Sequence, residues 1–317
     1  MKILVTGAAG FIGSHLCERL LQDERVEVIG LDAFVPSASP IWMRERNLHA
    51  LLRHPRFTLV KIDLRTVSWD QLLPNVDIVF HLAGMPGVRS SWGEDFKTYI
   101  AHNIAATQRL LEGCKRYSIR KFIYASTSSV YGQKTGPVVE SAVVEPLSPY
   151  GVSKLTGEHL CKVYAYNEQL PLVILRFFTV YGPRQRTDMA FHRFIRRMLE
   201  NKPIPLYGDG RQSRDFTYIA DCVDAVARAA YADGLIGETI NIGGKERASV
   251  LECISIIEEL FGRKADLQKV GDIYGEPKQT WADIGKAQSL LGYQPQTDLR
   301  TGLEAEYRFL RDLYRVQ

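Results

Sequence analysis

The sequence predicts an α/β protein with a Rossmann-like, doubly wound parallel sheet and a smaller C-terminal α/β domain for substrate. Three observations predict this class. Short apolar segments alternate with helical patterns in the first half of the chain, a glycine-rich turn joins the first strand to the first helix, and an aspartate ends the second strand. In such sheets, ligands bind beyond the carboxyl ends of the strands.

The composition is that of an ordinary globular protein. Of 317 residues, 45% are hydrophobic and 24% are charged, and the formal net charge of +4 is too small to indicate a nucleic-acid partner. The five cysteines are far apart and never form CxxC, which is typical of buried thiols in a reducing compartment. The seven histidines lack the spacing of metal ligands, so no metal site is expected.

The chain is expected to be soluble and cytoplasmic, with no membrane partner. No apolar run approaches the roughly 18 residues that a membrane span needs. No charged-then-apolar leader precedes the first strand, which begins at residue 2.

The first predicted strand (2–6) leads through a glycine turn into a predicted helix (14–21). The glycine spacing is GxxGxxG rather than GxGxxG, and the strand and helix around it give the pattern its weight. Glycines allow the backbone to approach a pyrophosphate, and the helix N-terminus presents free N–H groups to it. The residues predicted to hold a dinucleotide at this turn are Gly7, Gly10, Phe11, Ile12 and Gly13.

The next predicted strand (26–31) ends at Asp32, which lies 19 residues after Gly13. A carboxylate at this place can bind both ribose hydroxyls of NAD and would repel a 2′-phosphate. The alternative is an ordinary loop residue. We expect a loop and helix over 36–55, which contains prolines, arginines and few strand signals.

Two further strands are expected to bring residues to the cofactor. The third (57–62) is followed by Asp63 and Leu64, which are expected near the adenine. The fourth (76–82) ends at Ala83 and Gly84, whose small size would let the backbone lie beside the cofactor, and Leu82 and Ala83 are expected to contact it. A helix over 94–117 with Asn103 on its inward face and a strand over 121–125 follow.

Tyr150 and Lys154 are the expected catalytic pair. Four residues apart on a helix, they share one face. A phenol has a pKa of roughly 10, and an adjacent ammonium lowers it; reaching about 7 takes roughly 4 kcal/mol. With the hydroxyl of Thr127, they could take a proton from a sugar hydroxyl while hydride leaves the same carbon. YxxxK alone is far more often a solvated helix face, and the dinucleotide signals upstream favour the catalytic interpretation.

The segments TGAAGFIGSHL, HLAG, STSSVYG and YGVSK, together with Asp32 and Asp63-Leu64, resemble the extended short-chain dehydrogenase/reductase family of nucleotide-sugar enzymes. The resemblance covers essentially the whole chain, and HLAG in place of HLAA is a mild departure. It implies bound NAD, a Tyr150–Lys154–Thr127 triad and a homodimer formed through the 94–117 and Tyr150 helices. We expect residues 1–175, joined by 216–246, to bind NAD, and 176–215 with 247–317 to bind the nucleotide-sugar.

Ser128 and Ser129 indicate the type of reaction. The 4,6-dehydratases of the family carry Asp-Glu there as acid and base, and the UDP-glucuronate decarboxylases that resemble this chain carry a glutamate at the position of Ser129. A serine hydroxyl cannot replace a carboxyl group as the acid or base of these reactions. This leaves a 4-epimerase, in which the 4-keto sugar turns over and takes hydride back on its other face.

The second half of the chain indicates the sugar. The segment from Arg176 through Arg186 to Phe191 is similar to UDP-glucuronate 4-epimerases, whereas UDP-glucose 4-epimerases usually have asparagine at Thr179. Arg186, Thr179, Ser128 and Ser129 could bind a C6 carboxylate, for which a guanidinium is suited. Arg186 could instead contact the diphosphate or lie on the surface, and Thr187 replaces a family proline.

Other expected substrate contacts are Arg89, Phe191, Arg214 on the phosphate, and Glu276 on the uridine ribose or, alternatively, capping a turn before proline. The expected activity is interconversion of UDP-glucuronate and UDP-galacturonate without decarboxylation. The alternatives are UDP-glucose or UDP-N-acetylglucosamine 4-epimerase, then UDP-glucuronate decarboxylase, and outside enzymes an NAD-sensing scaffold.

Overall fold

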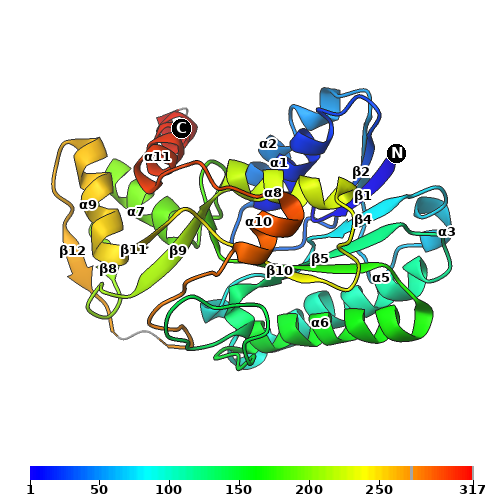
Figure 1. Ribbon diagram of the computed structural model, residues 1–317. Coiled ribbons are helices and arrows are strands. Elements are labelled where there is room, and N and C mark those ends of the chain that lie inside the picture. The colour runs from blue at the N-terminus through cyan, green and yellow to red at the C-terminus, as the bar shows by residue number, and fades with distance from the viewer. Residues whose placement is uncertain (272–273, 316–317) are drawn as a thin grey trace.

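A seven-stranded parallel sheet forms the centre of the structure, a computed structural model that describes residues 1–271 and 274–315 (Figure 1). The strand order, β10-β6-β5-β4-β1-β2-β3, confirms the predicted doubly wound sheet. Its strands are β1 (Lys2–Thr6), β2 (Glu27–Asp32), β3 (Phe57–Lys61), β4 (Ile78–His81), β5 (Lys121–Thr127), β6 (Leu172–Phe177) and β10 (Thr239–Ile242).

Helices cover both faces of this sheet, because strands buried on both sides need two apolar layers. In Figure 1, α1 and α8 lie above the sheet, and α5 and α6 lie below it. The helices of this lobe are α1 (Phe11–Leu20), α2 (Ile41–Asn47), α3 (Trp69–Leu72), α4 (Phe96–Tyr99), α5 (Ala106–Cys114), α6 (Pro149–Glu168), α8 (Ile219–Tyr231) and α10 (Gly285–Leu291).

The chain order reverses between β1 and β4. From β1 the chain continues outward to β2 and β3, whereas β4 is followed on the other side by β5 and β6. The carboxyl ends of β1, β4 and β5 therefore meet at one place, which is the site where sheets of this kind bind ligands.

A smaller lobe follows β6 and lies on the left of Figure 1. Phe191, Phe216, Ile254 and Leu303 are buried in its own apolar core. Its sheets contain β7 (Thr179–Tyr181), β9 (Ser213–Tyr218) and β11 (Glu246–Ser249), and separately β8 (Ile204–Leu206) and β12 (Leu267–Lys269). Its helices are α7 (Ala190–Leu199), α9 (Val250–Phe261) and α11 (Leu299–Arg315).

The helix expected over 94–117 is interrupted. It begins with a 3₁₀ turn (Gly93–Asp95) and α4, passes through a π-helical turn (Ile100–Ala105), and ends as α5. The π-helical turn contains the buried Asn103, whose side chain donates to Met85 O (3.0 Å) and accepts from Met85 N (2.6 Å). Such turns are frequent at functional sites, and this one holds the loop after β4.

Candidate active site

Two adjoining cavities meet at Tyr150, at the carboxyl ends of the central strands. The first is lined by every residue predicted to bind the cofactor: Gly7, Gly10, Phe11, Ile12, Gly13, Asp32, Asp63, Leu64, Leu82, Ala83, Tyr150 and Lys154. The second, of about 970 Å³, is lined by every predicted substrate residue: Arg89, Ser128, Ser129, Thr179, Arg186, Phe191, Arg214 and Glu276. Thr127 lines the second cavity, and Tyr150 and Arg186 line both.

The glycine turn after β1 has the shape that a pyrophosphate needs. Gly7 has a φ of 73°, in the left-handed region that favours glycine. A Cβ on Gly13 would lie 2.1 Å from the Gly7 carbonyl oxygen. The turn therefore packs directly on the first turn of α1, whose N-terminus faces the cavity, and these residues fit a dinucleotide.

Replacing Gly13 by alanine tests this close packing. An alanine in a helix interior ordinarily stabilises by up to about 1 kcal/mol, but here overlap with Gly7 should destabilise by about 1–3 kcal/mol. Urea unfolding would measure the difference. Gly10→Ala is the matched control, because its Cβ would lie 3.1 Å from the same oxygen; equal stability of the two variants would contradict the packing argument.

Asp32 is buried at the end of β2 with both carboxylate oxygens engaged. Oδ2 accepts from Ala9 N (3.0 Å) and Oδ1 from Phe34 N (2.9 Å). Burial raises the pKa of this carboxyl, and the two N–H groups and the nearby Arg44 act in the opposite direction. Asp63 lines the same cavity, but its carboxylate is bound by Arg65, at 2.8 Å from Nη2.

The catalytic triad predicted from the sequence is gathered at the junction of the two cavities. Burial raises the pKa of Tyr150, while the charge of Arg186 and the neighbouring Thr127 hydroxyl lower it. Lys154 is 7% exposed, with its Nζ 4.2 Å from the centroid of the Tyr124 ring. The positive charge that lowers the pKa of Tyr150 in this structure is that of Arg186. The sequence analysis expected Lys154 to have this effect, and a contribution from Lys154 stays a prediction.

Local bonds fix the helix that carries this pair. Ser148 caps α6 by accepting from Gly151 N (3.1 Å), and Pro149 occupies the first helical turn. Asn103 donates to Ser153 Oγ (2.9 Å) from the π-helical turn. The start of α6 is thus tied to the loop after β4, between the two cavities.

A buried ion pair behind the triad was missed by the sequence argument. Glu158 is fully buried and binds Arg176 twice, at 2.9 Å (Nε–Oε1) and 2.7 Å (Nη2–Oε2). It also accepts from Ser126 Oγ (2.5 Å), the residue before Thr127. The available signal was spacing, since Glu158 follows Lys154 by four residues on the same helix face.

The far end of the second cavity carries a carboxylate between two guanidiniums. Glu276 binds Arg89 Nε (2.8 Å) and Arg214 Nη2 (3.0 Å). Arg89 also lies over the Tyr207 ring, 4.0 Å from its centroid, and Tyr207 was not predicted as a site residue. This end offers cations, a carboxylate and an aromatic face to a nucleotide.

The end near Tyr150 is lined with hydroxyls. Thr127 Oγ1 donates to Ser129 Oγ (3.2 Å) and accepts from Ser129 N (3.2 Å). Thr179 lies in β7 on the same cavity. Arg186 is held by Asp188 through two bonds of 3.0 Å, so it is paired rather than free.

Within the described ranges, no three or more His, Cys, Asp or Glu side chains are grouped so that they could hold a metal ion. No helix there combines the length and apolarity required to cross a membrane. All five cysteines are free and buried, as predicted.

A model of the NAD dependent epimerase/dehydratase family matches residues 3–243. The chain is 58% identical over 314 residues to an uncharacterized UDP-glucose epimerase of Bacillus subtilis, with 99% of each chain covered. It is 38% identical over 308 residues to the UDP-glucuronate 4-epimerase of Thermodesulfobacterium geofontis, covering 95% of this chain and 93% of that one.

Among solved structures, the chain is similar to UDP-glucuronic acid 4-epimerase of Bacillus cereus, crystallised with UDP-glucuronic acid and NAD. The TM-score is 0.98 and the identity 53%, with 99% of this chain and 100% of that chain covered. The fold is thus matched over 99% of this chain.

Proposed function

This chain belongs to the NAD dependent epimerase/dehydratase family, and we propose that it interconverts UDP-glucuronate and UDP-galacturonate as a 4-epimerase. The observation that carries the proposal is the content of the second cavity. Hydroxyls of Thr127, Ser128, Ser129 and Thr179 line it with Arg186, and positions 128 and 129 carry no acid or base.

The first cavity holds NAD through the glycine turn, the carboxylate of Asp32 and the Tyr150–Lys154 pair. When bound there, NAD accepts a hydride from C4 of the sugar and later returns it. Asp32 accepts from the adenosine ribose hydroxyls, and helix α1 directs its N-terminus at the pyrophosphate.

Tyr150 acts as the base at the C4 hydroxyl. Its phenolate takes that proton while Thr127 holds the hydroxyl, and the same phenol returns a proton after the sugar has turned over. Arg89, Arg214 and Glu276 hold the nucleotide end throughout, so rotation of the sugar occurs about a fixed diphosphate.

The cavity also has to prevent loss of CO2. Oxidation at C4 of a glucuronate gives a β-keto acid. Such an acid loses CO2 when the bond between C5 and the carboxylate carbon is perpendicular to the plane of the C4 ketone. We infer that Thr179, Ser128 and Ser129 hold this bond near the plane. Arg186, which lines this cavity and is paired with Asp188, supplies the positive charge that faces the carboxylate.

Replacing Thr179 by alanine should release CO2 from UDP-glucuronate. Loss of one hydrogen bond to a charged group corresponds to about a tenfold or larger change in rate, and trapping the CO2 would measure it. Thr301→Ala, which alters an exposed threonine on α11 that binds Asp298, is the matched control. Retention of CO2 at the wild-type level in the Thr179 variant would count against the holding role.

UDP-glucose is the second candidate substrate, because the Bacillus subtilis relative carries that name. NMR of UDP-glucuronate and of UDP-glucose, each incubated with the protein, separates the two. We expect UDP-galacturonate to form from UDP-glucuronate at least about tenfold faster than UDP-galactose forms from UDP-glucose, because only the uronate offers a charged contact at C6. Equal rates, or a preference for UDP-glucose, would contradict the uronate assignment.

We propose the domain division 1–175 with 216–246, and 176–215 with 247–317. It is supported by β10, which pairs with β6 in the large sheet, and by α8, which packs on α1. Two elements depart from it: α10 (Gly285–Leu291) is buried against the core of the large lobe, and β9 (Ser213–Tyr218) crosses the boundary at 216 within the sheet of the smaller lobe. Residues 272–273 and 316–317 of the second unit lie outside the described residues.

We also propose a homodimer and a cytoplasmic location. The dimer is supported by apolar side chains exposed on α6 and the π-helical turn: Ile100, Val152, Val163 and Tyr166. These lie on the helices that the family resemblance implies as the contact. The location is supported by the five unpaired, buried thiols.

A further inference from the structure

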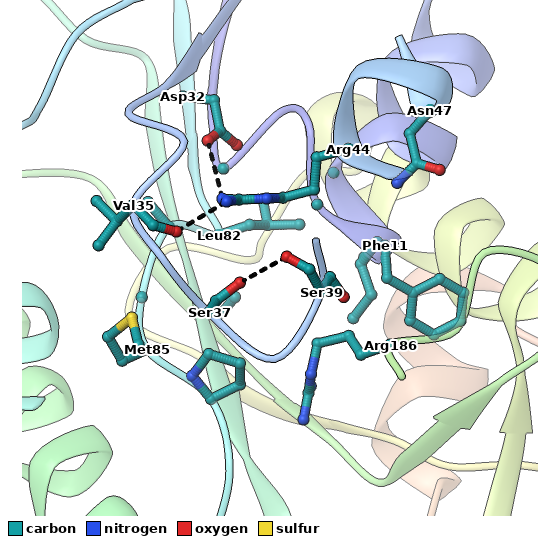
Figure 2. Close-up of a pocket in the computed structure, with 18 of the residues that line it drawn as sticks. Phe11, Asp32, Val35, Ser37, Ser39, Arg44, Asn47, Leu82, Met85 and Arg186 are labelled. Atoms are coloured by element: carbon teal, nitrogen blue, oxygen red, sulfur yellow. Dashed lines mark hydrogen bonds and ion pairs between the residues drawn. The ribbon is translucent and has the colours of Figure 1, made fainter. Parts of the chain in front are cut away.

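The buried guanidinium of Arg44 lies beside Asp32 in the first cavity. The side chains of Arg44 and Asp32 are 9% and 10% exposed, and Nη1 lies 3.9 Å from Oδ1. That distance is too long for a hydrogen bond. Figure 2 shows the guanidinium directed at both Asp32 and Val35.

Most hydrogen-bonding capacity of Arg44 is unused. Nη2 donates to Val35 O (2.8 Å), while Nε is buried and has no partner among the residues that the structure describes. A guanidinium offers five N–H donors, and a buried one without partners is costly. Arg44 lines the first cavity, so its donors are placed for a group bound there.

The surroundings of Arg44 are cationic and polar. Its guanidinium carbon lies 5.5 Å from the Phe34 ring centroid, and the Lys61 ammonium lies 5.1 Å from the same ring. Ser37 and Ser39 add hydroxyls to the wall of the cavity, as Figure 2 shows below Arg44. Asp32 is the carboxylate that lies beside Arg44 at this end of the cavity. The carboxylate of Asp63, in the same cavity, is paired with Arg65.

We propose that Arg44 is a specificity residue for the cofactor, and that the Asp32 carboxylate alone excludes an adenosine 2′-phosphate from a pocket that already contains its counter-charge. This rests on the proposed NAD site. A carboxylate accepts from a ribose 2′-hydroxyl and repels a phosphate there, whereas a guanidinium binds phosphate. With Asp32 neutral, Arg44 would face the 2′-phosphate of NADP.

The experiment measures which nucleotide the protein retains. Wild type, Asp32→Asn and Asp32→Ser are incubated with equal amounts of NAD and NADP and freed of unbound nucleotide; bound nucleotide is then released by denaturation and separated by chromatography. Serine is included because the NH2 of asparagine would face the N–H of either Ala9 or Phe34, each of which donates to an Asp32 oxygen in the wild type. We expect wild type to retain NAD and at least one Asp32 variant to raise the NADP/NAD ratio about tenfold or more, as one charged hydrogen bond allows.

Arg44→Met, added to the responsive Asp32 variant, should remove the NADP gain. Arg53→Met in the same background is the matched control, since Arg53 is exposed and does not line either cavity, and it should keep the gain. Asp32 variants that are folded by circular dichroism and retain no NADP, or a gain that survives Arg44→Met, would overturn the inference. If wild type retained neither nucleotide and did not epimerise UDP-glucuronate when NAD was added, the proposed function would be contradicted together with the inference. If wild type retained NAD and the variants retained no NADP, the inference alone would be contradicted.

Discussion

The Tyr150→Phe variant is expected to lose epimerisation of UDP-glucuronate, with a turnover rate lower by about 10²–10⁴-fold, the range that positioned acid–base groups contribute. The phenol is the group that takes the C4 proton, and phenylalanine keeps the ring without the proton acceptor. NAD and the sugar nucleotide should still bind, because neither cavity changes shape.

Two independent features of the structure support this role of Tyr150. Tyr150 lines both cavities, so it lies where cofactor and sugar meet. Arg186 and Thr127 act against the burial that raises the pKa of its phenol. A base that must work near neutral pH needs such compensation.

The rate would be measured by NMR of the sugar, and the retained NAD by chromatography after denaturation. Tyr231→Phe is the matched control, since Tyr231 lies on α8, outside both cavities, and is 46% exposed. Inversion at the wild-type rate in Tyr150→Phe would remove Tyr150 from the mechanism. Loss of NAD together with activity would assign it a binding role instead.

Glu158→Gln is expected to destabilise the protein by about 3–5 kcal/mol, because it leaves the Arg176 guanidinium buried beside an uncharged partner. Both side chains are at most 4% exposed, and the carboxylate joins α6, β6 and, through Ser126, the end of β5. Urea unfolding measures the loss of free energy.

The surface variant Glu304→Gln is the matched control for stability. It breaks an exposed pair with Arg308 on α11 and should cost less than about 1 kcal/mol. Adding Arg176→Met to Glu158→Gln removes the buried charge and should recover part of the loss. A Glu158→Gln variant as stable as wild type would contradict the account of this pair.

The same variant carries a pH signature. Burial lowers the pKa of Lys154 to about 8, while Cys161 and Glu158 act to raise it. Because burial raises the pKa of the Cys161 thiol, the negative charge at neutral pH comes from Glu158. Without it the pKa of Lys154 falls further, so the ammonium form is lost at lower pH. The alkaline limit of activity should therefore move to lower pH, which a loss of stability alone would not produce in the folded fraction.

The large sheet could be predicted because its signals are local. Apolar runs bounded by turn residues identified the central strands. The glycine spacing predicted a tight turn, and in the structure Gly13 packs closely on Gly7 at this turn. Asp32 followed from its position at the end of a strand.

Other features depend on contacts between distant segments. The π-helical turn at Ile100–Ala105 has nearly the apolar spacing of an α-helix, so periodicity cannot reveal it. Strands of three residues, such as β7 and β12, form only because partners exist in the folded chain. Arg44 and the Glu158–Arg176 pair acquire their surroundings through tertiary packing, and the helical spacing of Glu158 was the sole local hint.

Epimerisation of UDP-glucuronate in D2O tests the central claim most directly. Hydride that leaves C4 and returns to it never exchanges with solvent, so UDP-galacturonate should form with protium at both C4 and C5 and without pentose. Deuterium at C4 or C5 of the product, read by NMR, would contradict the account.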